Sequence, residues 1–455
     1  MLFFNRHKEI ERLKKALDRR EPELIVIYGR RRCGKSTLIR EVLRPGDVYF
    51  LAQQTDSSLQ RARLADAISA IIPGFEKAVY PDWESLFINL RNAAKSSFTL
   101  CLDEFPWLVK SDPALPGVLQ KMCDEAENRS FHIILCGSSQ QMMQGLVLDS
   151  SAPLYGRAHE MMKLTPLEAG WIQDALSCTP EQAITEYSIW GGIPRYWELR
   201  MQENSTEAAI RNIILDRYGV LHEEPMRLFL DDMRESVQAF SLLSLIGAGC
   251  NRLSEIAARL GKPASQLSRP LDNLIRLGYV RREIPFGENE KNSKKSLYKI
   301  SDPFMRFYFT FVVPNMSRLE MNLTEQVFDQ VNSRLAAFVS EEWENLCRRS
   351  IPLKPVAGIS FDLARRWWGY GTNGQPLEID VVAASAGKET LLAGECKWSD
   401  QINAHETLTK LKEKITLLPF ARNKTIIPVL FLKKKIHLPE ATIITPDDIL
   451  NTLKT

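Results

Sequence analysis

The sequence predicts an α/β protein in which a parallel sheet with a phosphate-binding loop is followed by a winged helix-turn-helix and a second α/β domain. Three observations predict this order. The motif GRRRCGKS follows the apolar run LIVIY, three helical patterns and then two strand patterns begin at Phe240, and two strands near the C-terminus carry Asp380 and Glu395. Each pattern marks a different part of the chain, so the sequence predicts several domains.

Length and composition are those of a globular protein of ordinary charge. The chain has 455 residues, of which 44% are hydrophobic and 25% charged. This length suggests about three domains, and the composition excludes a mainly disordered or fibrous chain. The 59 Lys and Arg residues nearly balance the 56 Asp and Glu residues, for a net charge of +3. This balance excludes a protein that is basic throughout, but it leaves room for a local basic patch.

The first glycine-rich motif lies between a predicted strand and a predicted helix. Leu24–Tyr28 is an apolar run typical of a buried strand, and Thr37–Leu43 continues as a helix. Between them, residues 29–36 fit the pattern G-x-x-x-x-G-K-[ST]. A strand, this loop and a helix are the context that a P-loop requires, and they predict a P-loop NTPase sheet.

The residue types in this loop suit a nucleoside triphosphate. Gly29 and Gly34 allow backbone N–H groups to turn inward around phosphate oxygens, and the helix that includes Thr37 adds positive potential at its N-terminus. We expect Lys35 to reach the β- and γ-phosphates and Ser36 to be a ligand of Mg²⁺.

A second strand supplies the acids that such a site needs. Phe98–Glu104 reads FTLCLDE, an apolar strand that ends in two carboxylates. Asp103 is the expected acid on the side of the metal, and Glu104 is the expected base that polarises the attacking water.

A third strand, Phe131–Cys136, runs into a glycine and two serines. Ser138 or Ser139 is a candidate for sensing the γ-phosphate or positioning water. The alternative is that these serines cap the helix predicted at Gln140–Leu146.

Further motifs resemble the archaeal-type ATPases, which are P-loop proteins of the AAA+ and STAND assemblage. These motifs are FNRHKEIERL, LDEFPWL, CGSS, PLYGR and WGGIPRY. The resemblance implies a five-stranded parallel sheet of ATPase type with a helical lid. It also implies that ATP is the nucleotide and that the chain is an ATPase.

The resemblance also assigns residues outside the loop. It implies that Arg6 and Glu9 lie beside the nucleotide, although Asn5 stands where the family usually has glycine. It implies that Pro194, in GGIP, belongs to a lid motif that packs near the base of the nucleotide. Arg157, in PLYGR, would report on the γ-phosphate in its own or a neighbouring subunit, and a structural salt bridge is the alternative.

The pattern changes at Phe240 to that of a winged helix-turn-helix. SLLSLIGAG predicts a first helix, Ser254–Leu260 a second with Ser254 as its N-cap, and Ser265–Leu277 a third. Gly261 ends the second helix and Gly278 ends the third. YVRREIPF and LYKIS predict the two strands of a wing. Three helices followed by a hairpin give the winged helix-turn-helix order.

The winged segment is basic. Residues 251–300 contain eleven Lys and Arg residues and five Asp and Glu residues, a net charge of +6. Arg269 and Arg276 on the third helix could contact nucleic-acid phosphates, or the module could serve only protein contacts or lid control. Pro270 is expected to kink or shorten the third helix, which argues against base reading in a major groove.

Two strands in the last third carry a possible metal site. Leu377–Ala383 carries Asp380, and Leu391–Trp398 carries Glu395 and Lys397. Glu395 and Lys397 share one face of their strand because side chains alternate along it. Asp380 and Glu395 would bind Mg²⁺ or Mn²⁺, and Lys397 would stabilise charge on a scissile phosphate.

This arrangement resembles the PD-(D/E)XK nuclease fold, the fold of restriction endonucleases, in which a helix with an acid precedes the strands. That acid would be Glu344, as a further metal ligand. Ile379 stands where the fold usually has the proline of its proline–aspartate pair. The alternative is a domain that keeps this fold without cutting. The neighbouring Trp367 and Trp368 are expected to be packing residues.

These patterns divide the chain into five segments. We expect a P-loop ATPase core (1–165), a helical lid (166–232), a winged helix-turn-helix (233–312), a connector (313–335) and a nuclease-like domain (336–455).

Three hypotheses for function follow. The first is an ATPase that couples a nucleotide switch to a DNA-directed, metal-dependent nuclease. The second is a regulatory STAND-like switch whose C-terminal parts serve only binding or protein interaction. The third is a DNA-binding regulator that uses the winged helix.

The spacing of the cysteines and the length of the apolar runs indicate the compartment in which the protein is expected. Eight scattered cysteines form no CxxC pair, which favours a reduced compartment. The N-terminus lacks the apolar stretch of a signal peptide, and no apolar run approaches the ~18–20 residues that span a bilayer. We expect a cytoplasmic protein that binds DNA and does not contact a membrane. The sequence leaves open whether the chain forms a homo-oligomer or binds a protein partner.

Overall fold

A computed structural model describes residues 4–125, 130–147, 149–232, 236–290, 293 and 295–454. The chain divides into two compact units, one formed mainly by residues 3–166 and the other mainly by residues 167–229 and 235–455. The expected division between lid and winged helix at residue 233 lies outside the described residues.

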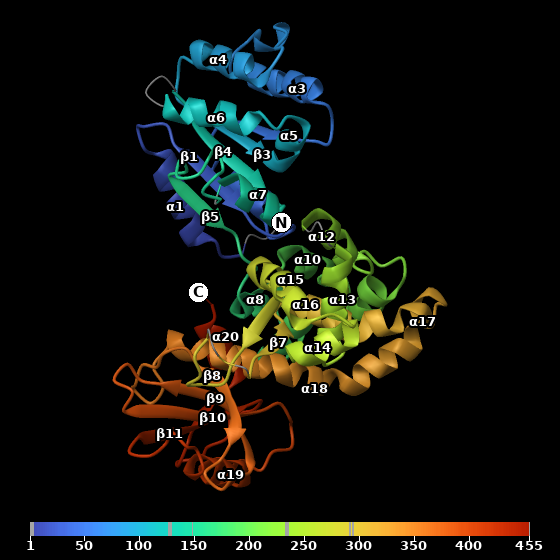
Figure 1. Ribbon diagram of the computed structural model, residues 1–455, viewed down its shortest axis with the longest axis vertical. Helices are drawn as coiled ribbons and strands as arrows, with labels where there is room; N and C mark the ends of the chain where they lie inside the picture. The colour runs from blue at the N-terminus through green and yellow to red at the C-terminus, as the bar shows by residue number, and fades with distance from the viewer. Residues whose placement is uncertain are drawn as a thin grey trace. The chain divides into compact units, whose positions relative to one another are not determined.

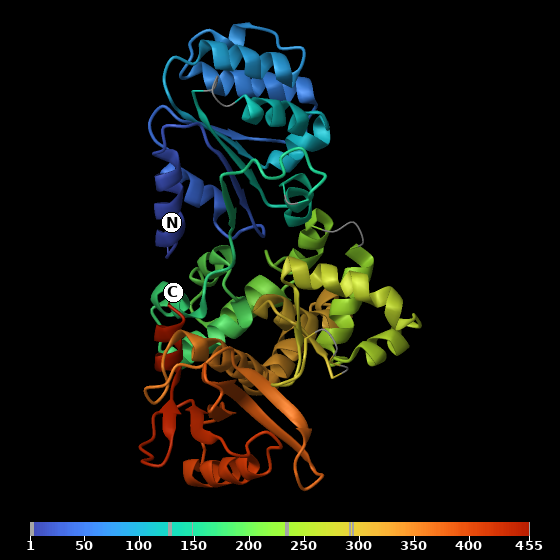
Figure 2. The same cartoon turned by 60° about the vertical axis from the view of Figure 1, so that its left-hand side comes forward.

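The first unit is a parallel sheet between helices. Its strand order is β2-β3-β4-β1-β5, and every neighbouring pair is parallel. Helices α3, α4, α5 and α6 gather on one side of this sheet and α1 lies on the other (Figures 1 and 2). The strands are β1 (Leu24–Tyr28), β2 (Val48–Leu51), β3 (Thr99–Asp103), β4 (His132–Gly137) and β5 (Glu160–Lys163).

The helices of this unit follow the strands in alternation, as a parallel sheet requires. They are α1 (His7–Leu17), α2 (Lys35–Val42), α3 (Ser57–Ser69), α4 (Trp83–Ala93), α5 (Phe105–Ser111), α6 (Leu115–Asp124) and α7 (Gln140–Val147), with a 3₁₀ turn at Phe75–Lys77. Strands β1, β3 and β4 are buried along their whole length, which explains their continuous apolar runs. This sheet confirms the predicted P-loop ATPase core.

The second unit begins with short helices. These are η3 (Ala169–Trp171), α8 (Ile172–Leu176), α9 (Pro180–Trp190), α10 (Pro194–Arg200), α11 (Thr206–Ala209), the π-helical η4 (Ile210–Leu215) and α12 (Glu224–Asp232). The motif that includes Pro194 lies between α9 and α10. A Cβ on Gly192 would come within 1.9 Å of the carbonyl oxygen of Leu167, so the close approach of two backbones requires glycine here.

A winged helix-turn-helix follows, in the predicted order. It consists of α13 (Ser236–Gly247), α14 (Leu253–Leu260), α15 (Ala264–Leu277) and the antiparallel strands β6 (Val280–Glu283) and β7 (Leu297–Ile300). Gly261 and Gly278 end α14 and α15 in the left-handed conformation, as expected.

Two local predictions in this domain were wrong. The N-cap of α14 is Arg252, and Ser254 lies within the first turn of the helix. Of the two effects expected of Pro270, shortening of α15 is wrong, because the helix continues for seven residues beyond it to Leu277, and a kink stays a prediction.

Apolar helices lead to the C-terminal sheet. They are α16 (Pro303–Phe307), the π-helical η5 (Tyr308–Val312), η6 (Val313–Asn315), α17 (Met316–Glu320), the 27-residue α18 (Thr324–Ser350) and η7 (Ile351–Leu353). Since α18 is one continuous helix, it crosses the expected connector boundary at residue 336.

The C-terminal sheet is mixed, with the order β12-β11-β10-β9-β8. Strands β8, β9 and β10 are antiparallel neighbours, and β10, β11 and β12 run parallel. Helix α18 lies on one side of the sheet and α19 on the other (Figures 1 and 2). The elements are β8 (Arg365–Tyr370), β9 (Pro376–Ala384), β10 (Thr390–Lys397), α19 (Ala404–Thr416), β11 (Thr425–Leu432), β12 (Thr442–Ile444) and α20 (Pro446–Thr452).

Candidate functional site

The loop between β1 and α2 has the backbone that the motif predicts. Gly29 has a φ of +154°, and a Cβ there would come within 2.2 Å of the carbonyl oxygen of Leu164, beyond β5. Gly34 has a φ of +89° and is the N-cap of α2. Both positions therefore require glycine, and the first turn of α2, which includes Thr37, directs its backbone N–H groups toward the loop.

Lys35 is buried and bent back onto this loop. Its Nζ donates hydrogen bonds to the carbonyl oxygens of Gly29 at 2.9 Å and Arg30 at 3.1 Å. An ammonium group surrounded by the loop is positioned to meet an anion that enters it.

Ser36, in the first turn of α2, meets Asp103, at the carboxyl end of β3. Ser36 Oγ donates to Asp103 Oδ2 at 2.7 Å, and Tyr49 Oη donates to the same oxygen at 2.6 Å. The hydroxyl of Tyr49, from β2, was not predicted, because a tyrosine in the run VYFL looks like a core residue.

The Asp103 carboxyl is held in its ionised form. Burial would raise its pKa, but hydrogen bonds from Cys136, Tyr49, Ser36 and the backbone of Glu104 outweigh burial and lower the pKa below its ordinary value. A hydroxyl and an ionised carboxylate are hard oxygen ligands of the kind that Mg²⁺ prefers, so this pair fits that ion.

Glu104 and Ser138 also come together. Glu104 has a φ of +54°, a left-handed conformation that is uncommon for a residue with a side chain. Its Oε2 accepts hydrogen bonds from Ser138 Oγ at 2.9 Å and from the Ser138 backbone N–H at 3.3 Å. Of the two candidate serines, Ser138 binds the expected base. Ser139 Oγ accepts from the backbone N–H of Met142 at 3.4 Å in the first turn of α7.

Arg6 is buried at the start of the same unit. It pairs with Glu9 at 3.0 Å and donates to the carbonyl oxygen of Thr165 at 2.5 Å. These bonds tie the N-terminal segment to the end of the unit.

Arg157 does not join the loop residues of its own chain. It lies just before β5, and the register of β1 with β5 pairs Ile25 with Glu160 at the amino ends of both strands. The loop follows the opposite, carboxyl end of β1. Arg157 instead forms a bidentate ion pair with Asp124, with N–O distances of 2.7 and 2.9 Å. The structure thus contains the salt bridge that was the alternative for Arg157, and a contact with a γ-phosphate, in its own or a neighbouring subunit, stays a prediction.

Pro194 lies in the second unit, as the first residue of α10. Near it, Trp197 Nε1 donates to the carbonyl oxygen of Gly191 at 2.7 Å. The GGIP motif thus has a packing role within this unit.

In the C-terminal sheet, the predicted residues gather around β9 and β10. The Oδ2 atom of Asp380 accepts from the backbone N–H of Cys396 at 2.8 Å. Glu395 accepts from Lys397 at one oxygen and from Lys414 at the other, both at 2.8 Å. Lys414, on α19, was not predicted, because a lysine on an amphipathic helix looks like a solvated surface charge.

Helix α18 brings Glu344 toward this cluster. Burial raises the pKa of Glu344 to about 7, and the nearby Asp380 carboxylate adds to the rise. Burial and the Glu395 carboxylate likewise raise the pKa of Asp380. Glu395 differs, because Lys397 and Lys414 outweigh its burial and lower its pKa. Burial therefore decides the direction of the pKa shift at Glu344 and Asp380, although Arg348 lies 3.5 Å from Glu344, whereas two lysines compensate Glu395.

The expected set of three carboxylate ligands does not form. Across the described ranges, no group of three or more His, Cys, Asp and Glu side chains is arranged to hold a metal ion. The physical reason is that the two lysines engage both oxygens of Glu395. Asp380 and Glu344 still fit an ion such as Mg²⁺, which often takes one or two carboxylates and completes its shell with water and phosphate oxygens.

Some basic residues of the wing form ion pairs with acidic residues of the same chain. Arg281 pairs with Glu283 at 2.9 Å, and Lys299 pairs with Glu341 of α18 at 2.7 Å. Arg306 of α16 reaches the same Glu341 at 3.1 Å. The +6 charge of residues 251–300 therefore overstates what the wing can offer a ligand, and Lys291 and Lys294 of that count lie outside the described residues.

The surface of α14 and α15 remains basic. Arg259, Lys262, Arg269 and Arg276 are all exposed there. This is the surface that the helix-turn-helix order assigns to nucleic acid.

The fold and the loop geometry together define a P-loop ATPase with a winged helix-turn-helix and a C-terminal mixed sheet. Residues 3–198 match the ATPase domain predominantly from Archaea. Residues 237–283 match the IclR helix-turn-helix domain, and residues 308–411 match a family of archaeal and bacterial proteins of unknown function.

A relative extends this match along most of the chain. The chain is 31% identical over 410 residues to uncharacterized protein MJECL04 of Methanocaldococcus jannaschii, with 88% of each chain covered. The chain belongs to the archaeal-type ATPase family.

A solved ATPase structure shares this fold. The Walker-type ATPase paby2304 of Pyrococcus abyssi aligns with a TM-score of 0.53 at 19% identity, covering 68% of this chain and 96% of that one. The ORC2 protein of Aeropyrum pernix aligns with a TM-score of 0.40 at 15% identity, covering 70% and 96%, which is too weak to carry an argument.

The remaining general predictions concern cysteines and membranes. All eight cysteines are free thiols. Among the residues that the structure describes, no helix has the length and hydrophobicity needed to cross a membrane.

Proposed function

We propose that the first unit binds ATP with Mg²⁺ and hydrolyses it. The observation that carries this proposal is the set of contacts that joins Ser36 to Asp103 and Ser138 to Glu104 at the carboxyl edge of one sheet, beside Lys35. These are the groups that a P-loop enzyme needs for the phosphates, the metal and the attacking water.

Each residue has a distinct role in this proposal. Lys35 leaves the loop carbonyls and binds the β- and γ-phosphates. Ser36 and Asp103 hold the metal, which when bound neutralises phosphate charge. Glu104 accepts the proton of the attacking water, and Ser138 fixes the direction of the Glu104 carboxylate.

The test compares ATP binding with turnover in the full chain. Lys35→Ala is expected to lose ATP binding, measured with a fluorescent ATP analogue, and hence turnover. Arg44→Ala is the control, because Arg44 follows the same helix, is 53% exposed and pairs with Asp18 rather than with a residue of the loop. Wild-type affinity for ATP in Lys35→Ala would refute the site.

We propose that the C-terminal domain cleaves DNA with Mg²⁺ or Mn²⁺ and that the ATPase controls it. The supporting observation is that Arg348 donates to the carbonyl oxygen of Asp380 and pairs with Glu344, which brings these two residues to one place, while Lys397 lies on the strand next to that of Asp380. A cation would satisfy the two carboxylates, and Lys397 would stabilise the charge of the scissile phosphate.

This second activity is tested by incubating the chain with labelled DNA, with each metal, and with or without ATP. Asp380→Asn is expected to abolish cleavage and to leave ATP turnover unchanged. Asp400→Asn, on the loop after β10, is the matched control. If wild type cuts no DNA under any of these conditions, the nuclease proposal fails.

A binding role for the C-terminal domain is the competing candidate. It is favoured by the two lysines that engage both oxygens of Glu395. In that case the chain is a regulatory ATP switch, and it turns over ATP without phosphodiester cleavage while retaining a stable protein partner.

DNA contact through α14 and α15 is a part of the proposal that can be tested separately. The supporting feature is the exposed basic surface of these helices. DNA binding should weaken with salt, fall in Arg269→Gln, and survive Lys35→Ala.

A further inference from the structure

Two cavities adjoin between the winged helix-turn-helix and strand β8 of the C-terminal sheet. The first has a volume of about 880 Å³ and the second about 950 Å³, and Arg282 and Trp368 line both. All of their lining residues belong to the second unit. We call the two cavities together the wing–sheet groove.

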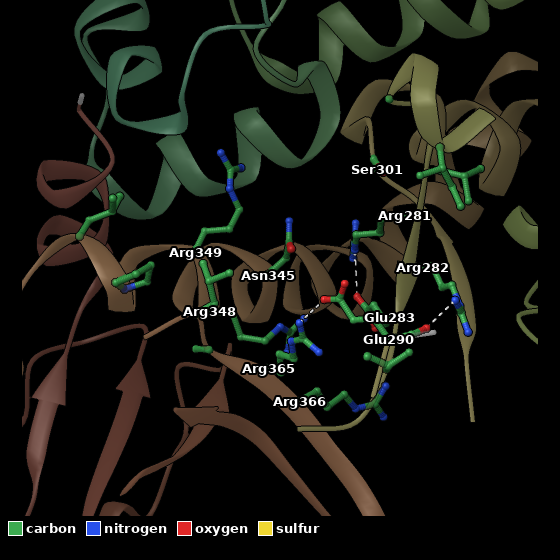
Figure 3. Close-up of a pocket in the computed structure, with 18 of the residues that line it drawn as sticks. Arg281, Arg282, Glu283, Glu290, Ser301, Asn345, Arg348, Arg349, Arg365 and Arg366 are labelled. Atoms are coloured by element: carbon green, nitrogen blue, oxygen red, sulfur yellow. Dashed lines mark hydrogen bonds and ion pairs between the residues drawn. The ribbon is translucent and has the colours of Figure 1, made fainter. Parts of the chain in front are cut away.

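The first cavity is rich in arginine. Its lining includes Arg281, Arg282, Arg348, Arg349, Arg365 and Arg366, against the three acids Glu168, Glu283 and Glu290. Figure 3 shows these arginines arriving from the wing, from α18 and from β8, with Arg349 turned away from the space enclosed by the others. Arg349 pairs with Glu168. Arg281, Arg365 and Arg366 also form ion pairs, with Glu283, Glu290 and Glu378. A phosphate that binds Arg365 would displace Glu290, whose side chain is 73% exposed.

Arg348 connects this cavity to the carboxylate cluster. Its side chain is only 8% exposed, and its Nη2 has no hydrogen-bond partner among the residues that the structure describes. Its Nη1 donates to the carbonyl oxygen of Asp380 at 3.0 Å and lies 3.5 Å from Glu344 Oε2. A buried guanidinium nitrogen without a partner is costly, and a phosphate oxygen in the cavity would satisfy it.

The outer face of β8 adds aromatic rings. Arg366, Trp368 and Tyr370 share one face of this strand, since side chains alternate. The guanidinium of Arg366 lies 5.6 Å from the centre of the Trp368 ring, and Tyr370 is 71% exposed. Trp367 points the other way and packs on Phe420 in the core. Thus only Trp367 is fully buried as expected, and Trp368 lines the groove.

We propose that the wing–sheet groove binds a single strand of nucleic acid and leads it toward Asp380. Its phosphates contact Arg348 and Arg365, and its bases stack on Trp368 and Tyr370. Arginines along a groove with exposed aromatic rings are the means by which proteins bind single strands. The cavities have the volume of small-ligand sites, which admits nucleotides of one strand but not a duplex. This inference specifies the substrate of the nuclease proposal and rests on it.

The experiment measures binding of a short fluorescein-labelled oligothymidylate by anisotropy, in EDTA and without ATP, so that neither cleavage nor turnover contributes. Trp368→Leu and Tyr370→Ala are each expected to weaken binding at least fivefold, about the smallest loss expected for one stacked base. Arg365→Gln should reduce the slope of log affinity against log salt by about 0.7. Circular dichroism melting checks the folding of each variant, and Tyr370→Ala removes only an exposed side chain.

Two controls lie outside the groove. Tyr218→Ala removes another exposed tyrosine, 79% exposed, and Arg227→Gln removes an arginine of α12 whose side chain is 57% exposed. Neither should change single-strand affinity by more than about twofold, and a duplex of equal length should compete poorly.

Three results would overturn the proposal: unchanged single-strand affinity in all three groove variants, equal competition by duplex, or full competition by inorganic phosphate at the same concentration. Because binding is read without cleavage, the groove and the nuclease activity can fail separately. Cleavage with normal kinetics in the groove variants would refute the groove alone. Single-strand binding that needs the groove, without cleavage, would refute the nuclease alone.

Discussion

Glu341 and Glu344 lie one turn apart on α18. Removing the charge of each should change the free energy of unfolding in opposite directions. Glu341 accepts from Lys299 and Arg306, and these cations outweigh its burial and lower its pKa from 4.5 to about 2. Glu344 lies next to Asp380, and its pKa is raised from 4.5 to about 7. Replacing each by glutamine keeps the shape of the side chain and removes its charge.

The magnitude follows from the pKa shifts. At roughly 1.4 kcal/mol per pKa unit, the shift of Glu341 corresponds to about 3 kcal/mol of stability at neutral pH. Its side chain is 37% exposed, so solvent screening reduces this to about 1–2 kcal/mol. Glu341→Gln should therefore lower the free energy of unfolding at pH 7.5.

Because one pKa is lowered and the other raised, the two glutamates affect stability in different pH ranges. A lowered pKa contributes stability above the unfolded pKa, and this is lost only as pH falls from about 4.5 toward 2. A raised carboxyl pKa costs stability as pH rises from about 4.5 to 7. Glu344→Gln should therefore be more stable than wild type at pH 7.5, by about 1–3 kcal/mol, and nearly equal to it at pH 4.5.

Urea unfolding followed by tryptophan fluorescence at pH 7.5 and 4.5 measures both effects. The reasoning is refuted if Glu341→Gln matches wild type at pH 7.5, or if Glu344→Gln is destabilised there as much as Glu341→Gln. A shift of both variants in the same direction would mean that loss of packing, rather than charge, decides the outcome.

Three further predictions concern single contacts. Tyr49→Phe removes a hydrogen bond that keeps Asp103 ionised, so the acid limb of the ATPase pH profile should move to higher pH and turnover should fall several-fold; an unchanged profile contradicts this. Arg157→Ala should leave the melting temperature nearly unchanged, because its pair with Asp124 is exposed to solvent, and should leave ATP affinity unchanged. If Arg157 acts on a neighbouring subunit, wild-type turnover per chain rises with protein concentration and that of Arg157→Ala does not. Gly192→Ala should destabilise the chain by about 1–3 kcal/mol, seen as a lower melting temperature, while Gly117→Ala, whose Cβ would meet open space, should not.

The sequence was most informative where function depends on adjacent residues. Residues 29–36 predicted the loop because its backbone comes from one short segment of the chain, and FTLCLDE predicted Asp103 because strand and acid are contiguous. Ser138 could be predicted as one of two candidates, since it also follows a strand directly.

The sequence was least informative where two elements meet from far apart in the chain. Tyr49 and Lys414 each join a predicted acid from another element, and neither has a local pattern that distinguishes it from a core or surface residue. The position of Arg157 follows from strand direction, because a residue before a parallel strand lies at the edge away from the loop. The charge of the wing depends on partners in α18 that no local count includes.

The binding of ATP by Glu104→Gln, compared with its hydrolysis, tests the central claim most directly. Glutamine keeps the size of Glu104 and can still accept from Ser138, but it cannot take a proton from water. The account predicts wild-type ATP affinity with turnover reduced by at least about a hundredfold, the usual contribution of a general base. Turnover close to that of wild type, at normal affinity, would contradict it.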